Sequence, residues 1–512
     1  MTPINMLKSF SAQWPILPCV AIVVFVLYKL SVARNKSSLP LPPGPRPLPL
    51  LGNVLQFPTQ NLGRGFRDLS EKYGDVVHLR VLGQSIILIG SYEAACDILE
   101  KRSANYSDRP SSAMVELTDL DWVFVFKSYG PEWRKYRRVM HNAFTPDAIA
   151  RYWPVQLQTT RELLHNLLTS PANFSAHIHF SFAATVLRTV YGLDISPGDD
   201  KYYQLIERLG LITANIATPG QHSVEAFPSL RYLPSWLPGM GFKKQAAVWR
   251  EESAAVRDSL YKSAKETMVR TGVKESILTM MTEKYAEEDL VRNLTATIYS
   301  SSADTTNAST HALILALAMH PEVQRKAQAE LDNVVGPDRL PEFSDRDALP
   351  YVNAIVKEIV RWHAVAPVGG AHRSEADDEY NGYFIPAKSI IIPNQWAMSR
   401  DPAHYPNPDA FNPDRFLSNG KLNPNVRDPA TFVFGFGRRI CPGRHFAEAT
   451  LFIICASILH TMNIGPALDE NGVPKKLEMK TNGLAVERPK PFECRFTARN
   501  AHMEELVFAS ET

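Results

Sequence analysis

The stretch Phe434-Gly-Phe-Gly-Arg-Arg-Ile-Cys-Pro-Gly443 places one cysteine, Cys441, inside a glycine-rich loop. Glycines let a backbone turn sharply and pass close to a bulky partner, where a Cβ atom would collide. From Arg444 onward, apolar residues follow one another as they do in a well-packed helix. The loop therefore presents Cys441 just before a helix N-terminus, where the positive end of the helix dipole favours a thiolate over a thiol.

A single thiolate held in this way is suited to be an axial ligand of haem iron. The alternative is a buried structural cysteine in a turn, which is the commoner role of a lone cysteine. Phe434, Gly437, Arg439, Cys441 and Gly443 resemble the F-x-x-G-x-R-x-C-x-G signature of the cytochrome P450 family. The resemblance implies haem b (iron protoporphyrin IX) as the cofactor, with Cys441 as the iron ligand, Arg439 as a propionate partner and Phe434 beside them. Five fixed positions are far more specific than a lone glycine motif, so we favour the ligand interpretation.

The resemblance also implies the fold, which is mainly α with a large helical lobe and a small β-rich lobe. The 512 residues alone would suggest two or three domains. The family instead fills such a length with one haem domain, here expected at 48–500 and followed by a C-terminal tail, 501–512. Alternating apolar residues around the Leu82-Gly83 turn predict two short strands of the small lobe.

Composition excludes some classes of function. The chain has 55 basic and 53 acidic residues and a net charge of +2, so no nucleic-acid-binding footprint is visible. Its five cysteines form no C-x-x-C pair and give an odd total, which fits a reducing compartment better than a disulfide scaffold.

Residues 14–30 are apolar apart from Lys29, and about 17 helical residues span roughly 25 Å, the short end of what crosses a bilayer. We expect a lumenal N-terminus (1–13), a single-pass transmembrane anchor (14–30) and a basic, proline-rich linker (31–47). Positive charges crowd the C-terminal side of the apolar run, which predicts a cytosolic catalytic domain. This layout resembles that of microsomal family members, which implies that the protein is located in the endoplasmic reticulum membrane. The alternative is a cleaved signal peptide ending near Ser31-Val-Ala33.

A proline-interrupted apolar stretch from Phe227 to Phe242 also bears on the membrane. Its aromatic residues and the following Lys243 and Lys244 are typical of a membrane interface, although a buried connecting loop is the alternative. The stretch resembles fungal secondary-metabolism members of the family, such as the tryptamine 4-monooxygenase and O-methylsterigmatocystin oxidoreductase groups.

Residues 288–319 predict one long helix that contains Ser301-Ser-Ala-Asp-Thr-Thr306, which resembles the family's A/G-G-x-D/E-T motif. An acid beside a hydroxyl can relay protons to a dry pocket, so we expect Asp304 as the relay acid and Thr305 as the hydroxyl nearest oxygen. The alternative is that both side chains only bond back to their own helix. Ser302 replaces the usual glycine, which puts the detailed proton path in doubt.

Trp133 and Arg137 lie four residues apart and so share one helix face. They match the family's W-x-x-x-R pair, which implies that they bind a haem propionate. The alternative is an ordinary amphipathic surface helix. His372 falls where the family places a propionate-binding Arg or His, although a plain surface histidine is the alternative.

Glu358 and Arg361 match E-x-x-R, with both charges on one helical face. Arg415, in a stretch that resembles P-E-R-F, would complete a Glu–Arg–Arg cluster. We expect this cluster to be a structural scaffold for the cysteine loop; an ordinary exposed pair is the alternative.

The resemblance implies a monooxygenase that inserts one atom of O2 into a lipophilic small molecule: a terpenoid, a polyketide, an aromatic secondary metabolite or a xenobiotic. No flavin or nicotinamide fingerprint occurs in the sequence, so we expect electrons from NADPH through a separate NADPH-cytochrome P450 reductase, with cytochrome b5 as a second donor. One alternative is a haem-thiolate isomerase or dehydratase that does not use O2, and another is a membrane-tethered haem-binding sensor. The Asp304-Thr305 pair argues against both.

Overall fold

The computed structural model describes residues 38–512 apart from 197–199, 219, 273–274, 483–485 and 511–512. The expected lumenal segment and anchor, together with residues 31–37 of the expected linker, lie outside these residues. Within the part of the chain that is described, no helix combines the length and the apolar character needed to cross a bilayer.

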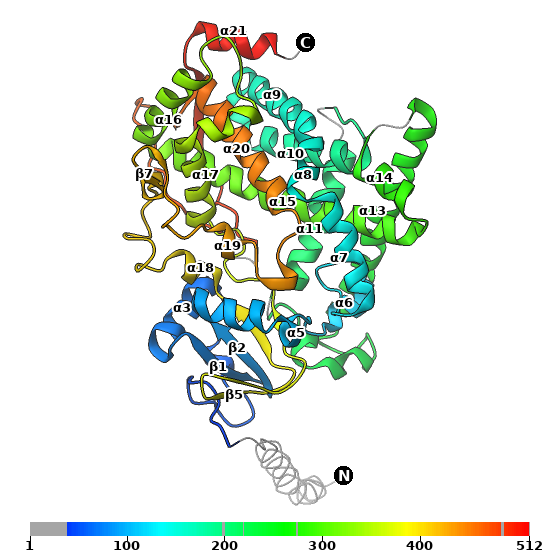
Figure 1. The fold of residues 1–512 in the computed structure, drawn as a ribbon. Helices are drawn as coiled ribbons and strands as arrows, with labels where there is room; N and C mark the ends of the chain where they lie inside the picture. Colours follow the sequence, from blue (N-terminus) through cyan, green and yellow to red (C-terminus); the bar gives the residue numbers. More distant parts are fainter. Residues whose placement is uncertain (1–37, 197–199, 219, 273–274, 483–485, 511–512) are drawn as a thin grey trace, which may run out of the picture.

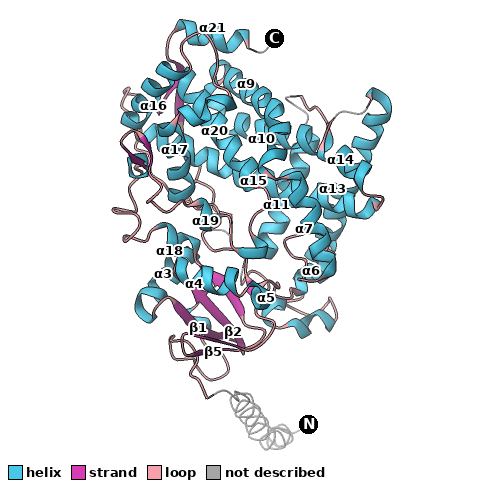
Figure 2. Ribbon diagram, viewed as in Figure 1, coloured by secondary structure: helices cyan, strands magenta, loops and turns pink. Residues whose placement is uncertain are grey.

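Helices dominate the structure and form the larger lobe in Figure 1, while β1, β2 and β5 lie in a small lobe at one end (Figure 2). The mainly α fold with a small β lobe is therefore confirmed. The long helices are α3 (Leu62–Tyr73), α7 (Pro131–Ala143), α9 (Trp153–Thr169), α10 (Phe174–Tyr191), α11 (Asp200–Ala217), α13 (Gly241–Thr271), α14 (Ile277–Lys284), α15 (Glu288–Met319), α16 (Pro321–Val334), α17 (Pro350–Trp362), α20 (Arg444–Thr461) and α21 (Ala501–Ala509). The shorter ones are α4 (Tyr92–Ala95), α5 (Ser103–Tyr106), α6 (Ala113–Thr118), α8 (Pro146–Ile149), α12 (Ser223–Ala226), α18 (Gln395–Ser399) and α19 (Ala430–Val433).

The small lobe is built on a four-stranded sheet with the order β1-β2-β6-β3. The hairpin of β1 (Val76–Val81) and β2 (Gln84–Ile89) is antiparallel, and Val76 faces Ile89. Leu82 and Gly83 both have positive φ angles, 49° and 88°, as a two-residue hairpin turn requires. Strand β6 (Ile390–Pro393) joins β2 in parallel, and β3 (His372–Arg373) pairs antiparallel with β6. The described residues also form three two-stranded sheets: β4 (Asp378–Tyr380) with β5 (Tyr383–Ile385), β7 (Leu417–Ser418) with β8 (Lys421–Leu422), and β9 (Met462–Pro466) with β10 (Cys494–Ala498).

Helix α15 lies in the middle of the helical lobe, where it contacts α10, α11, α13, α17 and α20 (Figure 1). Its 32 residues span about 48 Å at 1.5 Å per residue. Leu313, Ile314 and Leu317 are fully buried, and helix α20 buries Phe452 and Ile453 in the same core. Apolar packing thus fixes two helices against each other: α15, which carries the candidate oxygen-side residues, and α20, which follows the candidate ligand loop.

Candidate active site

The loop around Cys441 is held in place by its glycines and by backbone hydrogen bonds. Gly435 and Gly437 adopt positive φ angles of 82° and 53°. A Cβ atom on Gly437 would lie 2.2 Å from the carbonyl oxygen of Leu99, so the loop can pack this closely only with glycine there. The amide of Cys441 donates a 2.7 Å hydrogen bond to the carbonyl of Phe434, which closes the loop on itself.

The charges around Cys441 are positive. Arg137 donates a 2.6 Å hydrogen bond to the carbonyl of Ile440, and Arg444 donates one of 3.3 Å to the carbonyl of Cys441. Burial raises the pKa of the Cys441 thiol, while the amide of Gly443 and then the two arginines act to lower it. Burial therefore opposes the thiolate, and a bound metal cation would favour it.

Trp133 and Arg439 come together on one side of this loop. The guanidinium carbon of Arg439 lies 4.5 Å from the centre of the Trp133 ring. Arg439 donates to the carbonyls of Ser107 (2.8 Å) and Lys127 (2.9 Å), but its third nitrogen, Nη1, is buried without a partner. The indole Nε1 of Trp133 is also buried without a partner. Two donors of this kind fit an anionic ligand group, because a buried N–H without an acceptor is costly.

Arg109 adds a second buried arginine to this region. It donates to the carbonyls of Val125, Gly370 and Ala371, with the bond to Gly370 at 2.6 Å. Burial lowers the pKa of Arg109 to about 10. Burial and then repulsion by Arg109 lower the pKa of Arg439 to about 9. Our sequence interpretation missed Arg109, because it lies in an irregular segment where no spacing singles out one arginine.

His372 lies beside the two arginines at the edge of the sheet, on β3. It is buried, and its Nδ1 donates a 2.7 Å hydrogen bond to the carbonyl of Tyr106. Burial, followed by the charges of Arg109 and Arg439, lowers its pKa to about 3. The histidine beside the two arginines is therefore neutral and adds no positive charge. The carboxylates of haem b would pair with the buried positive charges of Arg109 and Arg439. Trp133, His372, Arg109 and Arg439 thus fit the propionate side of the cofactor.

Arg137 occupies a different position from Trp133, although the two share helix α7. Arg137 donates to the backbone of the cysteine loop. Trp133 instead stacks with Phe124, at 5.5 Å between ring centres, and lies under Arg439. One member of the pair therefore supports the ligand loop, while the other presents a free donor.

On helix α15, the hydroxyl of Thr305 donates to the carbonyl of Ser301 at 3.2 Å. Ser302 donates to the carbonyl of Ile298 at 2.7 Å in the same way. Helix α15 continues without a break through these residues, so no opened turn is present where the family usually has glycine. The extra hydroxyl of Ser302 is engaged by its own helix, and it adds bulk without offering a free donor.

Unlike Thr305 and Ser302, Asp304 directs its side chain to a residue outside its own helix. It forms a 2.5 Å ion pair with Arg488, a residue near the C-terminal end of the chain. The structure therefore brings the Asp304 carboxylate to Arg488, while the Thr305 hydroxyl bonds to its own helix.

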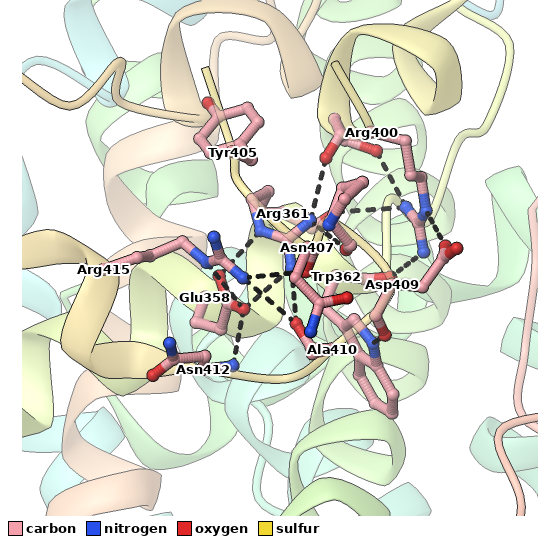
Figure 3. A network of polar contacts seen from close by, with 12 residues as sticks. Glu358, Arg361, Trp362, Arg400, Tyr405, Asn407, Asp409, Ala410, Asn412 and Arg415 are labelled. Atoms are coloured by element: carbon pink, nitrogen blue, oxygen red, sulfur yellow. Dashed lines mark hydrogen bonds and ion pairs between the residues drawn. The ribbon is translucent and has the colours of Figure 1, made fainter. Parts of the chain in front are cut away.

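Glu358, Arg361 and Arg415 form one buried network (Figure 3). Both oxygens of Glu358 accept 2.7 Å hydrogen bonds from Arg361, and one also accepts from Arg415 at 3.2 Å. The side chains of Glu358 and Arg361 are fully buried. Arg361 also donates to the carbonyls of Ser399, Pro408 and Ala410. The network ties helix α17 to the segment that leads toward the cysteine loop.

Comparison with known proteins agrees with this site. Residues 42–496 match the sequence profile of the cytochrome P450 family. The chain is 41% identical to cytochrome P450 monooxygenase COX1 of Coprinopsis cinerea, over 95% of this chain and 97% of that one. It is 35% identical to a cytochrome P450 monooxygenase of Armillaria gallica, over 95% of this chain and 97% of that one. It is 36% identical to tryptamine 4-monooxygenase of Psilocybe cyanescens, over 93% of this chain and 96% of that one.

The chain therefore belongs to the cytochrome P450 family, a family of enzymes that bind haem b. The expected family, cofactor and monooxygenase class are confirmed, as is the similarity to fungal members that include a tryptamine 4-monooxygenase.

Proposed function

We propose that this protein inserts one oxygen atom of O2 into a hydrophobic small molecule, using electrons that NADPH supplies through a separate reductase. The observation that carries the proposal is the arrangement around Cys441, where Arg439 and Trp133 keep buried donors without partners that are suited to propionates. The Asp304-Thr305 pair lies on the long helix α15, which packs against α20, the helix that follows the cysteine loop. Haem with a cysteine thiolate supplies the one-electron chemistry and favours cleavage of the O–O bond.

The side chains around the cofactor each have a role in this proposal. Cys441 is the iron ligand, and its loop is fixed by Arg137 and by the carbonyl of Phe434. Trp133, Arg439, Arg109 and His372 hold and orient the propionates. Glu358, Arg361 and Arg415 form the scaffold behind the loop and have no part in the chemistry.

On the oxygen side, Thr305 presents a hydroxyl and Asp304 brings protons to it from solvent. Both lie on a helix packed deep in the core, which keeps bulk water from the reacting atoms. Positioning of the acid and the hydroxyl matters more here than the intrinsic acidity of either group.

The relatives support the class of substrate. One of them is named for acting on tryptamine, an aromatic amine, and others carry the name cytochrome P450 monooxygenase. We propose a fungal secondary metabolite, of the terpenoid, polyketide or aromatic type, as the substrate of this protein. NADPH-cytochrome P450 reductase is the proposed electron donor, with cytochrome b5 as an additional one.

We also propose that the protein is held at the endoplasmic reticulum membrane with its catalytic domain in the cytosol. The proline-interrupted stretch supports contact with lipid, because Tyr232 and Trp236 are 76% and 79% exposed and Phe227 is 51% exposed. Large aromatic side chains exposed beside Lys243 and Lys244 fit a membrane interface. Replacing Tyr232 and Trp236 by serine in the full chain should weaken binding to phospholipid vesicles, and unchanged binding would contradict lipid contact by this stretch.

The reaction is tested with the full chain, its reductase, NADPH and isotopically labelled O2, with fungal terpenoids, polyketides and aromatic amines as substrates. The expected product contains one labelled oxygen atom and forms only when both NADPH and reductase are present. A rearranged product without NADPH would show a haem-thiolate isomerase instead. A haem spectrum without turnover on any of these classes would favour the sensor.

A further inference from the structure

The ion pair between Asp304 and Arg488 joins the long helix to a hairpin that is far away in the sequence. Arg488 lies in a hairpin in which its amide donates to the side chain of Asn482 and its carbonyl accepts from the amide of Asn482, both at 3.1 Å. The same hairpin is closed by a 2.7 Å bond from the amide of Lys490 to the carbonyl of Lys480. The Asp304 side chain is only 14% exposed and that of Arg488 is 28% exposed, so water screens their attraction only in part.

A third element completes the environment of the carboxylate. Gly210, in helix α11, faces Asp304, and a Cβ atom at this position would lie 2.7 Å from Oδ2 of Asp304. The missing side chain of Gly210 therefore leaves the space that the carboxylate fills. Asp304 is held between α11 and the hairpin, with Arg488 binding Oδ1 and Gly210 admitting Oδ2.

Two histidines lie near Arg488, and neither carries a charge that would compete for the ion pair between Asp304 and Arg488. Burial, and then the charges of His311 and Arg488, lower the pKa of His179 to about 4. Burial and Arg488 also lower the pKa of His311, against an opposing hydrogen bond from its ring to the carbonyl of Asn307. Both rings are neutral at neutral pH. Within the described part of the chain, the carboxylate that pairs with Arg488 is that of Asp304.

We propose that Arg488 is a positioning residue for the proton relay: it holds the Asp304 carboxylate in the space that Gly210 leaves open and so fixes the acid relative to Thr305. The inference rests on the proposed function, in which Asp304 delivers protons. Without the guanidinium, the carboxylate can adopt other rotamers, and small displacements of a catalytic group lower the rate steeply. Arg488 touches neither the cofactor nor the reacting atoms in this account, and acts only through Asp304.

The first test compares Arg488→Gln and Arg488→Lys with the native protein. The measured quantities are product formed per NADPH consumed, peroxide released, kcat and KM for a substrate. Arg488→Gln should lower product per NADPH and kcat by on the order of 3- to 10-fold and leave KM nearly unchanged. Arg488→Lys should restore part of the loss, because it returns a cation to the site. A rise in KM with unchanged product per NADPH would overturn the proposal, since it would show that Arg488 serves substrate binding.

The second test crowds the carboxylate without touching the arginine. Gly210→Ala adds a Cβ atom close to Oδ2, yet alanine is the better helix former, so the helix itself is not weakened. Gly241→Ala in α13 is the matched control, because its Cβ atom would meet nothing within 4 Å. Gly210→Ala should lower product per NADPH in the same direction as Arg488→Gln, while the control should not. If Gly210→Ala and Gly241→Ala give the same product per NADPH, the position of the Asp304 carboxylate does not affect turnover.

A double-mutant cycle separates this inference from the proposed function. Melting temperatures are measured for the native protein, Asp304→Ala, Arg488→Gln and the double variant. A coupled pair predicts that Arg488→Gln lowers the melting temperature less in the Asp304→Ala background than in the native one. Additive effects would overturn the pairing, whether or not the enzyme turns over. If the melting temperatures are coupled but no NADPH-dependent turnover occurs, the proposed function alone is refuted. If Arg488→Gln lowers product per NADPH equally in the native and the Asp304→Ala backgrounds, the positioning role alone is refuted.

Discussion

The guanidinium of Arg439 lies over the indole ring of Trp133, 4.5 Å from its centre, and each side chain keeps one buried N–H without an acceptor. A buried donor left unpaired costs about 1–3 kcal/mol, so the pair stores free energy that an anionic ligand would release. The lowered pKa of Arg439, about 9, has the same origin, since burial and the neighbouring Arg109 both oppose its charge. These donors therefore fit carboxylates on this side of the site.

Removing one of these donors should loosen the cofactor. We expect Arg439→Leu or Trp133→Phe to weaken haem binding on the order of 10-fold, since one charge-assisted or buried hydrogen bond is lost. The measurement is the ratio of haem to protein after gel filtration. Arg138→Leu is the control, because Arg138 is exposed on the same helix α7. Full haem occupancy in both variants would contradict the assignment of the propionate side.

The Glu358 network should matter for folding far more than any exposed ion pair. Glu358→Gln leaves Arg361 fully buried without its carboxylate, which we expect to cost about 3–5 kcal/mol of unfolding free energy. Glu266→Gln is the control, since it removes an exposed pair with Lys262, worth about 0.2–1 kcal/mol. Denaturant unfolding followed by circular dichroism measures both. Similar losses in the two variants would show that the buried network is not a scaffold.

Two hydroxyls on α15 should differ in function although both bond to their own helix. Thr305→Ala removes the proposed relay hydroxyl, so product per NADPH should fall on the order of 10-fold and released peroxide should rise. Ser302→Ala removes a hydroxyl that bonds to its own helix and has no part in the proposed relay, so it should change this ratio little. If both variants keep full coupling, Thr305 has no part in proton delivery.

Acid should destabilise the protein partly through His363. This residue is buried, and burial followed by the charge of Arg400 lowers its pKa to about 3, against the weaker effect of a hydrogen bond with the backbone of Glu487. The unfolded state, with a pKa of about 6.5, takes up the proton first as the pH falls, so stability drops by up to ~1.4 kcal/mol per pH unit between about pH 6.5 and 3.

A variant tests this contribution directly. His363→Gln should reduce the fall in melting temperature between about pH 7 and pH 5, whatever its effect at neutral pH. His141→Gln, at an exposed position on α7, should leave that fall unchanged. An identical acid response of the native protein and His363→Gln would show that His363 does not govern it.

The sequence allowed the fold and much of the site to be anticipated, because the relevant signals are local. The spacing around Cys441 and between Glu358 and Arg361 is set within one loop or one helix turn. Asn412-Pro-Asp-Arg-Phe416 added Arg415 to that pair only through its resemblance to a known motif, and the structure joins it to Glu358.

The contacts that could not be anticipated join residues distant in the sequence. Arg488 meets Asp304 across 184 positions, and Gly210 opens space for the same carboxylate from a third element. Arg109 reaches the propionate side from an irregular segment in which several charged residues are equally plausible. Long-range pairing depends on how the helices and hairpins pack, which no local pattern records.

The central claim is that the Cys441 sulfur binds the iron of haem, and the absorption spectrum of the reduced, CO-bound protein tests it most directly. The native protein should show the long-wavelength Soret band of a thiolate-ligated haem, and Cys441→Ser should lose this band together with turnover. A native protein without haem, or a Cys441→Ser variant that keeps both the band and the activity, would contradict the account.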